Sequence, residues 1–138
     1  MLPYLILELE MGCSLWNWQV KAKHGFSNLT GIDYSKAAVE LTINILKEEG
    51  LKFFKIQVVD FLNPSAELKG FDVCIDKGTF DAISLRPEDR EEAKKCYVNS
   101  LKTVMQPGGF FIITSCNWTK EQLLQIFTPG TLTYWHIS

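Results

Sequence analysis

Residues 71–76, which read Phe-Asp-Val-Cys-Ile-Asp, decide the fold because they form a short apolar run that ends in a carboxylate. Two earlier runs have the same form: Ser27–Ile32 is followed by Asp33, and Lys55–Val59 is followed by Asp60. Short apolar runs rich in β-branched and aromatic residues are typical of buried strands. The repeated pattern predicts successive strands of one sheet, each with an acid at its carboxyl end.

Longer segments with helical spacing separate these strands. Ser35–Glu49 places its apolar residues roughly on one face, begins with a good N-cap residue, and is stopped by Gly50. A second helix is predicted to open at Pro87 and to reach Met105, where Pro107-Gly108-Gly109 breaks it. The chain therefore alternates strands with helices.

The most apolar strand is Gly109–Thr114, which we expect at the centre of the sheet because neither of its faces is polar enough to meet water. Thr119 and Gln122 form a capping box for a last short helix. Alternating strands and helices are joined by right-handed crossovers in parallel sheets. The prediction is an α/β fold, a Rossmann-like, doubly wound and mainly parallel sheet with helices on both faces.

Length and charge limit the class of protein. The 138 residues suit a single domain, 1–138, and 46% hydrophobic with 22% charged residues is ordinary for a globular protein. A net charge of -2 offers no basic field for nucleic acid. Met1–Glu10 is apolar but too short to cross a bilayer and lacks a basic leader region. We expect a cytoplasmic monomer without nucleic-acid or membrane partners, with the nucleus as the alternative compartment.

The four cysteines give no sign of a metal site or a disulfide framework. They are scattered without a C-x-x-C pair and without ligand spacing to the two histidines. Three of them sit in or beside apolar runs, which predicts buried, reduced thiols in a cytosolic protein. The four residues are Cys13, Cys74, Cys96 and Cys116.

Asp33, Asp60 and Asp76 are the first candidates for a binding site. Ligands of open parallel sheets bind beyond the carboxyl ends of the strands, where these three acids are predicted to lie. Any one of them alone is more often a residue that caps a turn. Three aspartates that each directly follow a predicted strand favour a site for a polyhydroxylated or cationic ligand.

Two short stretches resemble the cofactor-binding strand ends of class I methyltransferases. The run Gly31-Ile32-Asp33-Tyr34-Ser35 is similar to the acidic strand end whose carboxylate accepts hydrogen bonds from both ribose hydroxyls of S-adenosylmethionine. Val59-Asp60-Phe61 is similar to the next site, where the acid receives the adenine amino group and its neighbour packs on the base. The resemblance implies that Asp33, Tyr34, Asp60 and Phe61 bind this cofactor.

A third stretch narrows the resemblance to one group of enzymes. The run Asp76-Lys77-Gly78-Thr79-Phe80-Asp81 after the fourth strand, together with Ser115–Thr119, resembles the protein lysine methyltransferases that modify elongation factor 1-alpha. The resemblance covers about Lys23 to Phe127. It implies S-adenosylmethionine as cofactor, elongation factor 1-alpha as protein substrate, and methyl transfer to a lysine amine.

The resemblance also implies roles near the reacting atoms. Asp76 is expected to contact the cofactor and to hold the incoming amine, and Asn117 is the second expected catalytic residue. Phe80 and Trp118 are expected to line the lysine channel, because aromatic walls suit an amine that gains positive charge. The alternative for both aromatic residues is core packing, and Asp81 is expected to cap the helix after Gly78.

The two ends depart from the pattern of the family. The family has a glycine-rich turn after its first strand, but Leu5–Gly12 contains one glycine. At the other end the family adds two strands, one of them antiparallel, whereas residues 128–138 provide at most one short strand. We expect residues 1–22 to be aberrant, 128–138 to be truncated, the fifth strand to be an uncovered apolar edge, and cofactor binding to be poor.

Three other functions remain open at this stage. The fold alone admits a methyltransferase of a small molecule or an RNA, although the net charge of -2 argues against RNA. A non-catalytic module that binds the substrate is favoured by the missing glycine turn. A nicotinamide-binding Rossmann domain is the weakest alternative.

A shifted reading frame accounts for the N-terminal departure and makes a testable prediction. Joining the third base of each codon from Leu5 to the first two bases of the next permits Asp-Ile-Gly-Thr-Gly-Asn-Gly, and the glycine from Met11 followed by Gly12 is forced. We expect the transcript to carry codons compatible with this second reading. Sequencing the transcript checks it, and codons that forbid the glycines would contradict the hypothesis.

Overall fold

The computed structural model describes residues 4–7, 29–48, 50, 54–127 and 133–137. They form a six-stranded sheet in the order β3-β2-β1-β4-β5-β6, and every strand pair in it is parallel. The strands are β1 (Tyr4–Leu7), β2 (Leu29–Asp33), β3 (Phe54–Val58), β4 (Phe71–Lys77), β5 (Met105–Thr114) and β6 (Thr133–Ile137). The helices are α2 (Lys36–Glu48), α3 (Thr79–Ser84), α4 (Arg90–Val104) and α5 (Lys120–Phe127).

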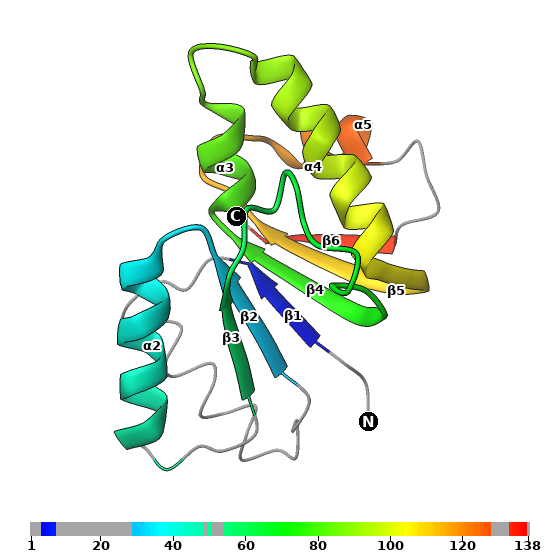
Figure 1. Ribbon diagram of the computed structural model, residues 1–138. Helices are drawn as coiled ribbons and strands as arrows, with labels where there is room; N and C mark the ends of the chain where they lie inside the picture. Colours follow the sequence, from blue (N-terminus) through cyan, green and yellow to red (C-terminus); the bar gives the residue numbers. More distant parts are fainter. Residues whose placement is uncertain (1–3, 8–28, 49, 51–53, 128–132, 138) are drawn as a thin grey trace.

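The predicted α/β fold is confirmed. Figure 1 shows α3, α4 and α5 gathered on one side of the sheet, while α2 lies away from them against β2 and β3. The chain order reverses its direction across the sheet at β1, which lies between β2 and β4. Such a reversal leaves a crevice at the carboxyl ends of the strands.

The boundaries of α2 follow from its sequence. The amide of Ala38 donates to the hydroxyl of Ser35 at 3.3 Å, so Ser35 caps the helix as predicted. Gly50 adopts φ 74° after the last turn and donates its amide to the carbonyl of Lys47 at 3.1 Å. Glycine is suited to this left-handed conformation because it has no Cβ.

The segment between α3 and β5 differs from the prediction at two points. α4 begins at Arg90 rather than at Pro87, because Asp89 has φ 49° and its carbonyl accepts the first helical hydrogen bond from Ala93. Pro107-Gly108-Gly109 does not break the chain between helix and strand but lies inside β5. The register between β4 and β5 shifts there, as in a bulge.

The C-terminal edge of the sheet also differs from expectation. β5, predicted to be central in the sheet, does have neighbours on both sides, β4 and β6. The prediction of an uncovered β5 edge is wrong, because β6 pairs with it from Phe110↔Thr133 to Thr114↔Ile137. One short strand after α5 is the most that the sequence predicts, and β6 is that strand.

The core is an aromatic cluster between β4, β5 and the helices on one side of the sheet. Ring centroids of its five members lie 5.0 to 6.4 Å apart in mostly edge-to-face geometry, which is the arrangement that aromatic quadrupoles favour. All five side chains are buried. They are Phe61, Phe80, Tyr97, Phe111 and Phe127.

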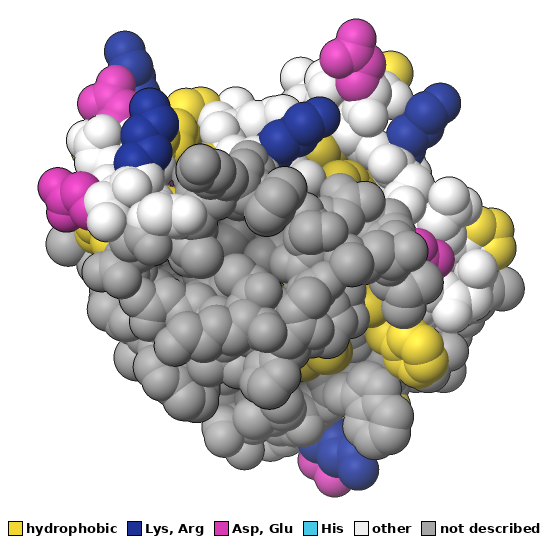
Figure 2. Space-filling view, turned by 90° about the horizontal axis from the view of Figure 1, so that it is seen from below, with side chains coloured by type: hydrophobic (Ala, Val, Ile, Leu, Met, Phe, Trp, Pro, Cys, Tyr) yellow, Lys and Arg dark blue, Asp and Glu magenta, His cyan; other side chains and the backbone are white. Residues whose placement is uncertain are grey.

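On the face shown in Figure 2, basic and acidic side chains of the described residues are interspersed around the rim. No helix in the described parts of the chain is long and apolar enough to cross a membrane.

Cys74, Cys96 and Cys116 are free thiols, but only Cys74 is buried and Cys116 is exposed, contrary to the expectation of buried thiols. Cys13 lies outside the described residues.

Gly109 gives a test of the bulge in β5. A Cβ at this position would lie 2.9 Å from the carbonyl oxygen of Asp72 and 3.0 Å from that of Gln106. Because both obstacles are backbone atoms, we expect Gly109→Ala to lower the free energy of unfolding by about 1–3 kcal/mol in urea titrations. Gln125→Ala, on the exposed side of α5, is the control and is expected to change it by less than about 0.5 kcal/mol. Equal stability of the two variants would contradict the close approach.

Candidate functional site

A cavity of about 310 Å³ opens at the carboxyl ends of β2 and β3, beside α3. This volume lies in the range of small-molecule sites. Its walls come from three segments: the carboxyl end of β2, the residues after β3, and α3, which follows β4. The lining residues are Ile32, Asp33 and Tyr34 from the end of β2, Val59, Asp60, Phe61 and Leu62 after β3, and Thr79, Ala82, Ile83 and Arg86 from α3 and the turn after it.

Asp33 stands where β2 gives way to α2. Its Oδ1 accepts a hydrogen bond from the amide of Ser35 at 2.8 Å, and its carbonyl accepts one from the amide of Val59 at 2.9 Å. The first bond orients the carboxyl group at the strand end, and the second joins the segment after β2 to the segment after β3. Tyr34, next in the chain, is 81% exposed at the mouth of the cavity.

Asp60 turns the chain directly after β3. Its Oδ1 accepts the amide of Leu62 at 3.1 Å, and its carbonyl accepts the amide of Asn63 at 2.9 Å. This tight turn places Phe61 in the cavity wall, where 4% of its surface remains exposed. The Phe61 and Tyr97 rings also pack edge to face with their centroids 5.2 Å apart, so the Phe61 side chain belongs both to the cavity wall and to the core.

The composition of the cavity suits a nucleoside. Two carboxylates, Asp33 and Asp60, can accept hydrogen bonds from hydroxyl and amino groups, and the surrounding walls are mostly apolar. An adenosine group has a flat apolar base, an exocyclic amine and two ribose hydroxyls, which match these two kinds of surface. The residues present therefore fit the adenosine part of S-adenosylmethionine. The glycine-rich turn of the family is expected to be missing from this chain, and residues 8–12, where it would stand, lie outside the described residues.

Asp76 does not face the crevice, and the expectation that it does is wrong. The side chain is fully buried and is absent from the cavity wall. Its Oδ1 accepts the amide of Thr79 at 2.8 Å, and its Oδ2 accepts the amide of Phe80 at 3.0 Å and the hydroxyl of Tyr97. The carboxylate therefore caps the first turn of α3 from inside the protein.

Burial changes the acidity of this group. Desolvation raises the pKa of Asp76 from its ordinary 3.8 to about 6, although the hydrogen bonds from Tyr97 and from the backbone amides oppose the rise. Burial and the adjacent Asp76 raise the pKa of Tyr97 well above its ordinary value. The hydroxyl of Tyr97 is therefore the donor and the carboxylate is the acceptor at neutral pH.

Asp81, expected to cap α3, instead reaches the loop after β5. Its carboxylate accepts the hydroxyl of Ser115 at 2.6 Å and the amide of Cys116 at 2.9 Å. The Ser115 hydroxyl in turn accepts the amides of Asn117 and Trp118 at 3.2 and 3.1 Å. The loop that carries both of these predicted site residues is thus tied to α3.

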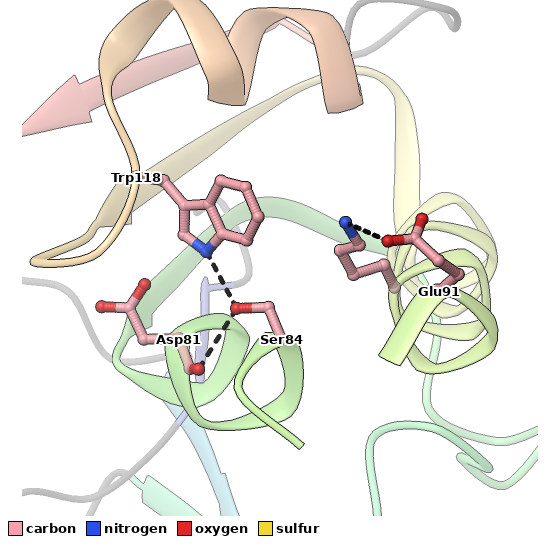
Figure 3. A network of polar contacts seen from close by, with 5 residues as sticks. Asp81, Ser84, Glu91 and Trp118 are labelled. Carbon is pink, nitrogen blue, oxygen red and sulfur yellow. Dashed lines mark hydrogen bonds and ion pairs between the residues drawn. The ribbon is translucent and has the colours of Figure 1, made fainter. Parts of the chain in front are cut away.

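Phe80 and Trp118 have different surroundings. Phe80 has no exposed surface and contacts the rings of the core cluster, so the expectation that it lines an open channel is wrong and core packing is its observed role. Trp118 is half-buried, and its indole N–H donates to the hydroxyl of Ser84 at 2.8 Å (Figure 3). The ammonium of Lys94 lies 5.0 Å from the centre of the same ring.

Asn117 lies apart from the cavity, and its catalytic role stays a prediction. The residue is exposed in the loop after β5 and does not line the cavity formed by the described residues. The structure therefore brings together Asp33, Tyr34, Asp60 and Phe61, and it separates Asp76, Phe80, Trp118 and Asn117 from them.

Sequence reasoning missed the third wall of the cavity. Thr79, Ala82, Ile83 and Arg86 follow the spacing of one helical face, and this signal was available in the sequence directly after the strand end. Tyr97 was also missed. It lies 21 residues from Asp76 in the chain, and no local pattern marks a tyrosine in an amphipathic helix as the partner of a buried acid.

Comparison with known proteins supports the resemblance. The family model described as a methyltransferase domain matches residues 17–134. EEF1A lysine methyltransferase 2 of Danio rerio is 84% identical over 125 residues, covering 91% of this chain and 53% of that protein. The Homo sapiens protein of the same name is 59% identical over 109 residues, covering 79% of this chain and 46% of that protein. The chain thus spans about half the length of the curated relatives it matches.

Solved structures agree with the fold. An S-adenosylmethionine-dependent methyltransferase from Clostridium acetobutylicum has a TM-score of 0.63 at 23% identity, covering 80% of this chain and 41% of that one. PKMT2 from Rickettsia typhi, in complex with AdoHcy, has a TM-score of 0.63 at 18% identity, covering 78% and 19%. At these identities the likeness shows the fold alone.

The buried Asp76 predicts an unusual dependence of stability on pH. Because its pKa is higher in the folded protein than in the unfolded chain, its contribution is favourable below pH 4 and is lost as the pH rises through about 6. The rise corresponds to about 3 kcal/mol of unfolding free energy. We expect Asp76→Asn to lack this component in urea titrations between pH 4 and 7, whereas exposed Glu67→Gln retains it. Parallel pH profiles for wild type and Asp76→Asn would contradict this.

Proposed function

This chain belongs to the methyltransferase domain family, and we propose that it binds S-adenosylmethionine and forms part of an enzyme that methylates a lysine of elongation factor 1-alpha. The observation that carries the proposal is the meeting of Asp33 and Asp60 at one apolar cavity. The names of the relatives from Danio rerio, Mus musculus and Homo sapiens support the choice of substrate.

In this proposal the described residues bind the adenosine part of the cofactor. Asp33 accepts hydrogen bonds from the ribose hydroxyls, and Asp60 accepts one from the adenine amine. Ile32, Phe61 and Ile83 supply apolar surface for the base. Because the carbonyl of Asp33 holds the amide of Val59, the two carboxylates stand on joined segments.

The proposed reaction is an in-line displacement. When bound, S-adenosylmethionine supplies an electrophilic methyl group next to a sulfonium. The neutral lysine amine forms the new C–N bond as the C–S bond breaks, and the amine then loses a proton to solvent. The protein contributes by positioning the two reactants and excluding water, since the displacement needs no covalent enzyme intermediate.

Asp76 acts at a distance from this chemistry. Its carboxylate is enclosed and holds the start of α3, which supplies Thr79, Ala82 and Ile83 to the cavity wall. Asp76 therefore does not contact the amine in this proposal. Asn117 stays a predicted catalytic residue, and the monomeric state and cytoplasmic location stay predictions too.

Calorimetric titration of this chain with S-adenosylhomocysteine tests the proposal. Because Leu5–Gly12 contains one glycine, we expect weak binding by this chain and tighter binding by a version that carries Asp-Ile-Gly-Thr-Gly-Asn-Gly in that segment. In both proteins we expect Asp33→Asn to weaken binding about 10- to 100-fold, because hydrogen bonds to a charged group are lost at the ribose. Glu67→Gln, an exposed acid outside the cavity, is the matched control and is expected to bind like wild type. Equal affinities with and without Asp33→Asn would place the nucleoside elsewhere. Absence of binding both by this chain and by the version with the glycine-rich turn would overturn the cofactor assignment.

The transfer step has its own readout. We incubate the version with the glycine-rich turn with purified elongation factor 1-alpha and methyl-labelled S-adenosylmethionine, and we expect it to label a lysine of that protein, identified by mass spectrometry of the peptides. This chain, with one glycine in Leu5–Gly12, is expected to label it weakly or not at all. Labelling of RNA or of small molecules instead would redirect the proposal to another substrate class.

A further inference from the structure

We propose that Tyr97 is a positioning residue for the cofactor cavity, which acts through Asp76 on one wall and through Phe61 on another. Tyr97 itself has no exposed surface and does not line the cavity. The inference rests on the proposed function, because it concerns the same cavity. It adds a residue from α4 to a site whose other members come from the strand ends and from α3.

The first connection runs through the hydroxyl group of Tyr97. This hydroxyl donates to Oδ2 of Asp76, the same oxygen that accepts the amide of Phe80 at 3.0 Å. Oδ1 of Asp76 accepts the amide of Thr79 at 2.8 Å, and Thr79 lines the cavity. The direction of the carboxyl group therefore sets where α3 begins. Tyr97 is the only side chain among the described residues that fixes this direction by a hydrogen bond.

The second connection runs through the ring. The Tyr97 ring meets Phe61 edge to face, with centroids 5.2 Å apart and an interplanar angle of 62°. Phe61 is the residue after Asp60 and stands in the cavity wall. A rigid aromatic ring behind it limits how far this wall can retreat. One side chain thus supports the α3 wall and the wall after β3.

The arrangement cannot easily adjust if the hydroxyl is lost. Asp76 and Tyr97 are both without exposed surface, and Phe80, Phe111 and Phe127 surround the Tyr97 ring. Removing the hydroxyl would leave the Asp76 carboxylate with backbone donors only. A buried charge that loses a donor protonates more readily. The protonated group accepts fewer hydrogen bonds, so the start of α3 would loosen.

Few other titratable groups in the described part of the chain face Asp76. Its partners across the sheet are Leu7 of β1 and Ile113 of β5, which carry no charge. Cys74, on the same strand, has its thiol pKa raised by burial and stays neutral at physiological pH. Asp81 of α3 acts on Tyr97 electrostatically but directs its own carboxylate to Ser115 and Cys116. Among these groups, Asp76 is the one whose pKa lies at about 6.

The test measures S-adenosylhomocysteine affinity of this chain from pH 5 to 8.5 for wild type, Tyr97→Phe and Leu101→Val. Leu101 is a buried residue of α4 without a hydrogen bond from its side chain, so its variant controls for lost core packing. We expect wild-type affinity to fall as the pH drops through about 6. Tyr97→Phe is expected to bind about 5- to 10-fold more weakly at pH 7.5, with the midpoint raised by about one pH unit.

Hydrogen exchange of the Thr79 and Phe80 amides gives a readout that needs no ligand. We expect these two amides to exchange about tenfold faster in Tyr97→Phe than in Leu101→Val, because their common acceptor is no longer held. Equal midpoints for wild type and Tyr97→Phe, or an equal shift in Leu101→Val, would overturn the role of Tyr97. Absence of ligand binding at every pH by this chain and by the version with the glycine-rich turn, with the exchange difference present, would instead overturn the proposed function and with it the inferred role in binding.

Discussion

The buried carboxylate of Asp76 is the constraint on which the rest of the structure depends. A charge without access to water is costly, and it persists only where donors surround it. Here those donors come from two backbone amides of α3 and from the hydroxyl of Tyr97 on α4. β4, α3 and α4 must therefore keep one mutual arrangement for the charge to be tolerated. Burying the carboxylate costs stability, and the same buried group fixes the position of the α3 wall of the cavity.

The cavity follows from the topology of the sheet around this constraint. β1 separates β2 from β4, so the segments after β2 and after β4 diverge and leave room between them. The segment after β3 closes the space from the far side through Asp60 and Phe61. The order of the strands brings Asp33 and Asp60 to the same edge of the sheet, and the turn after each acid orients its carboxylate. Asp33 and Asp60 use one carboxylate oxygen each to hold a neighbouring amide, at Ser35 and Leu62.

Much of this was predictable because it depends on local chemistry. Apolar runs that end in acids indicated the strands, Ser35 and Gly50 indicated the limits of α2, and Asp33 and Asp60 indicated two walls of the cavity. The failures concern contacts between distant segments. Whether Asp76 faces outward or inward depends on Tyr97, and whether β5 is an edge depends on β6. No periodicity within one segment carries that information, and the start of α4 depended on the unusual φ of Asp89.

The hydrogen bond from the Val59 amide to the Asp33 carbonyl has a consequence for the thermodynamics of binding. It fastens two loops that would otherwise be independent, so the conformational entropy of bringing the two acids together is lost during folding rather than on encounter with a ligand. A nucleoside that bridges Asp33 and Asp60 then meets a preorganised pair of acceptors. Its association needs little rearrangement at this end of the cavity, and the free and bound forms of these two loops are expected to coincide.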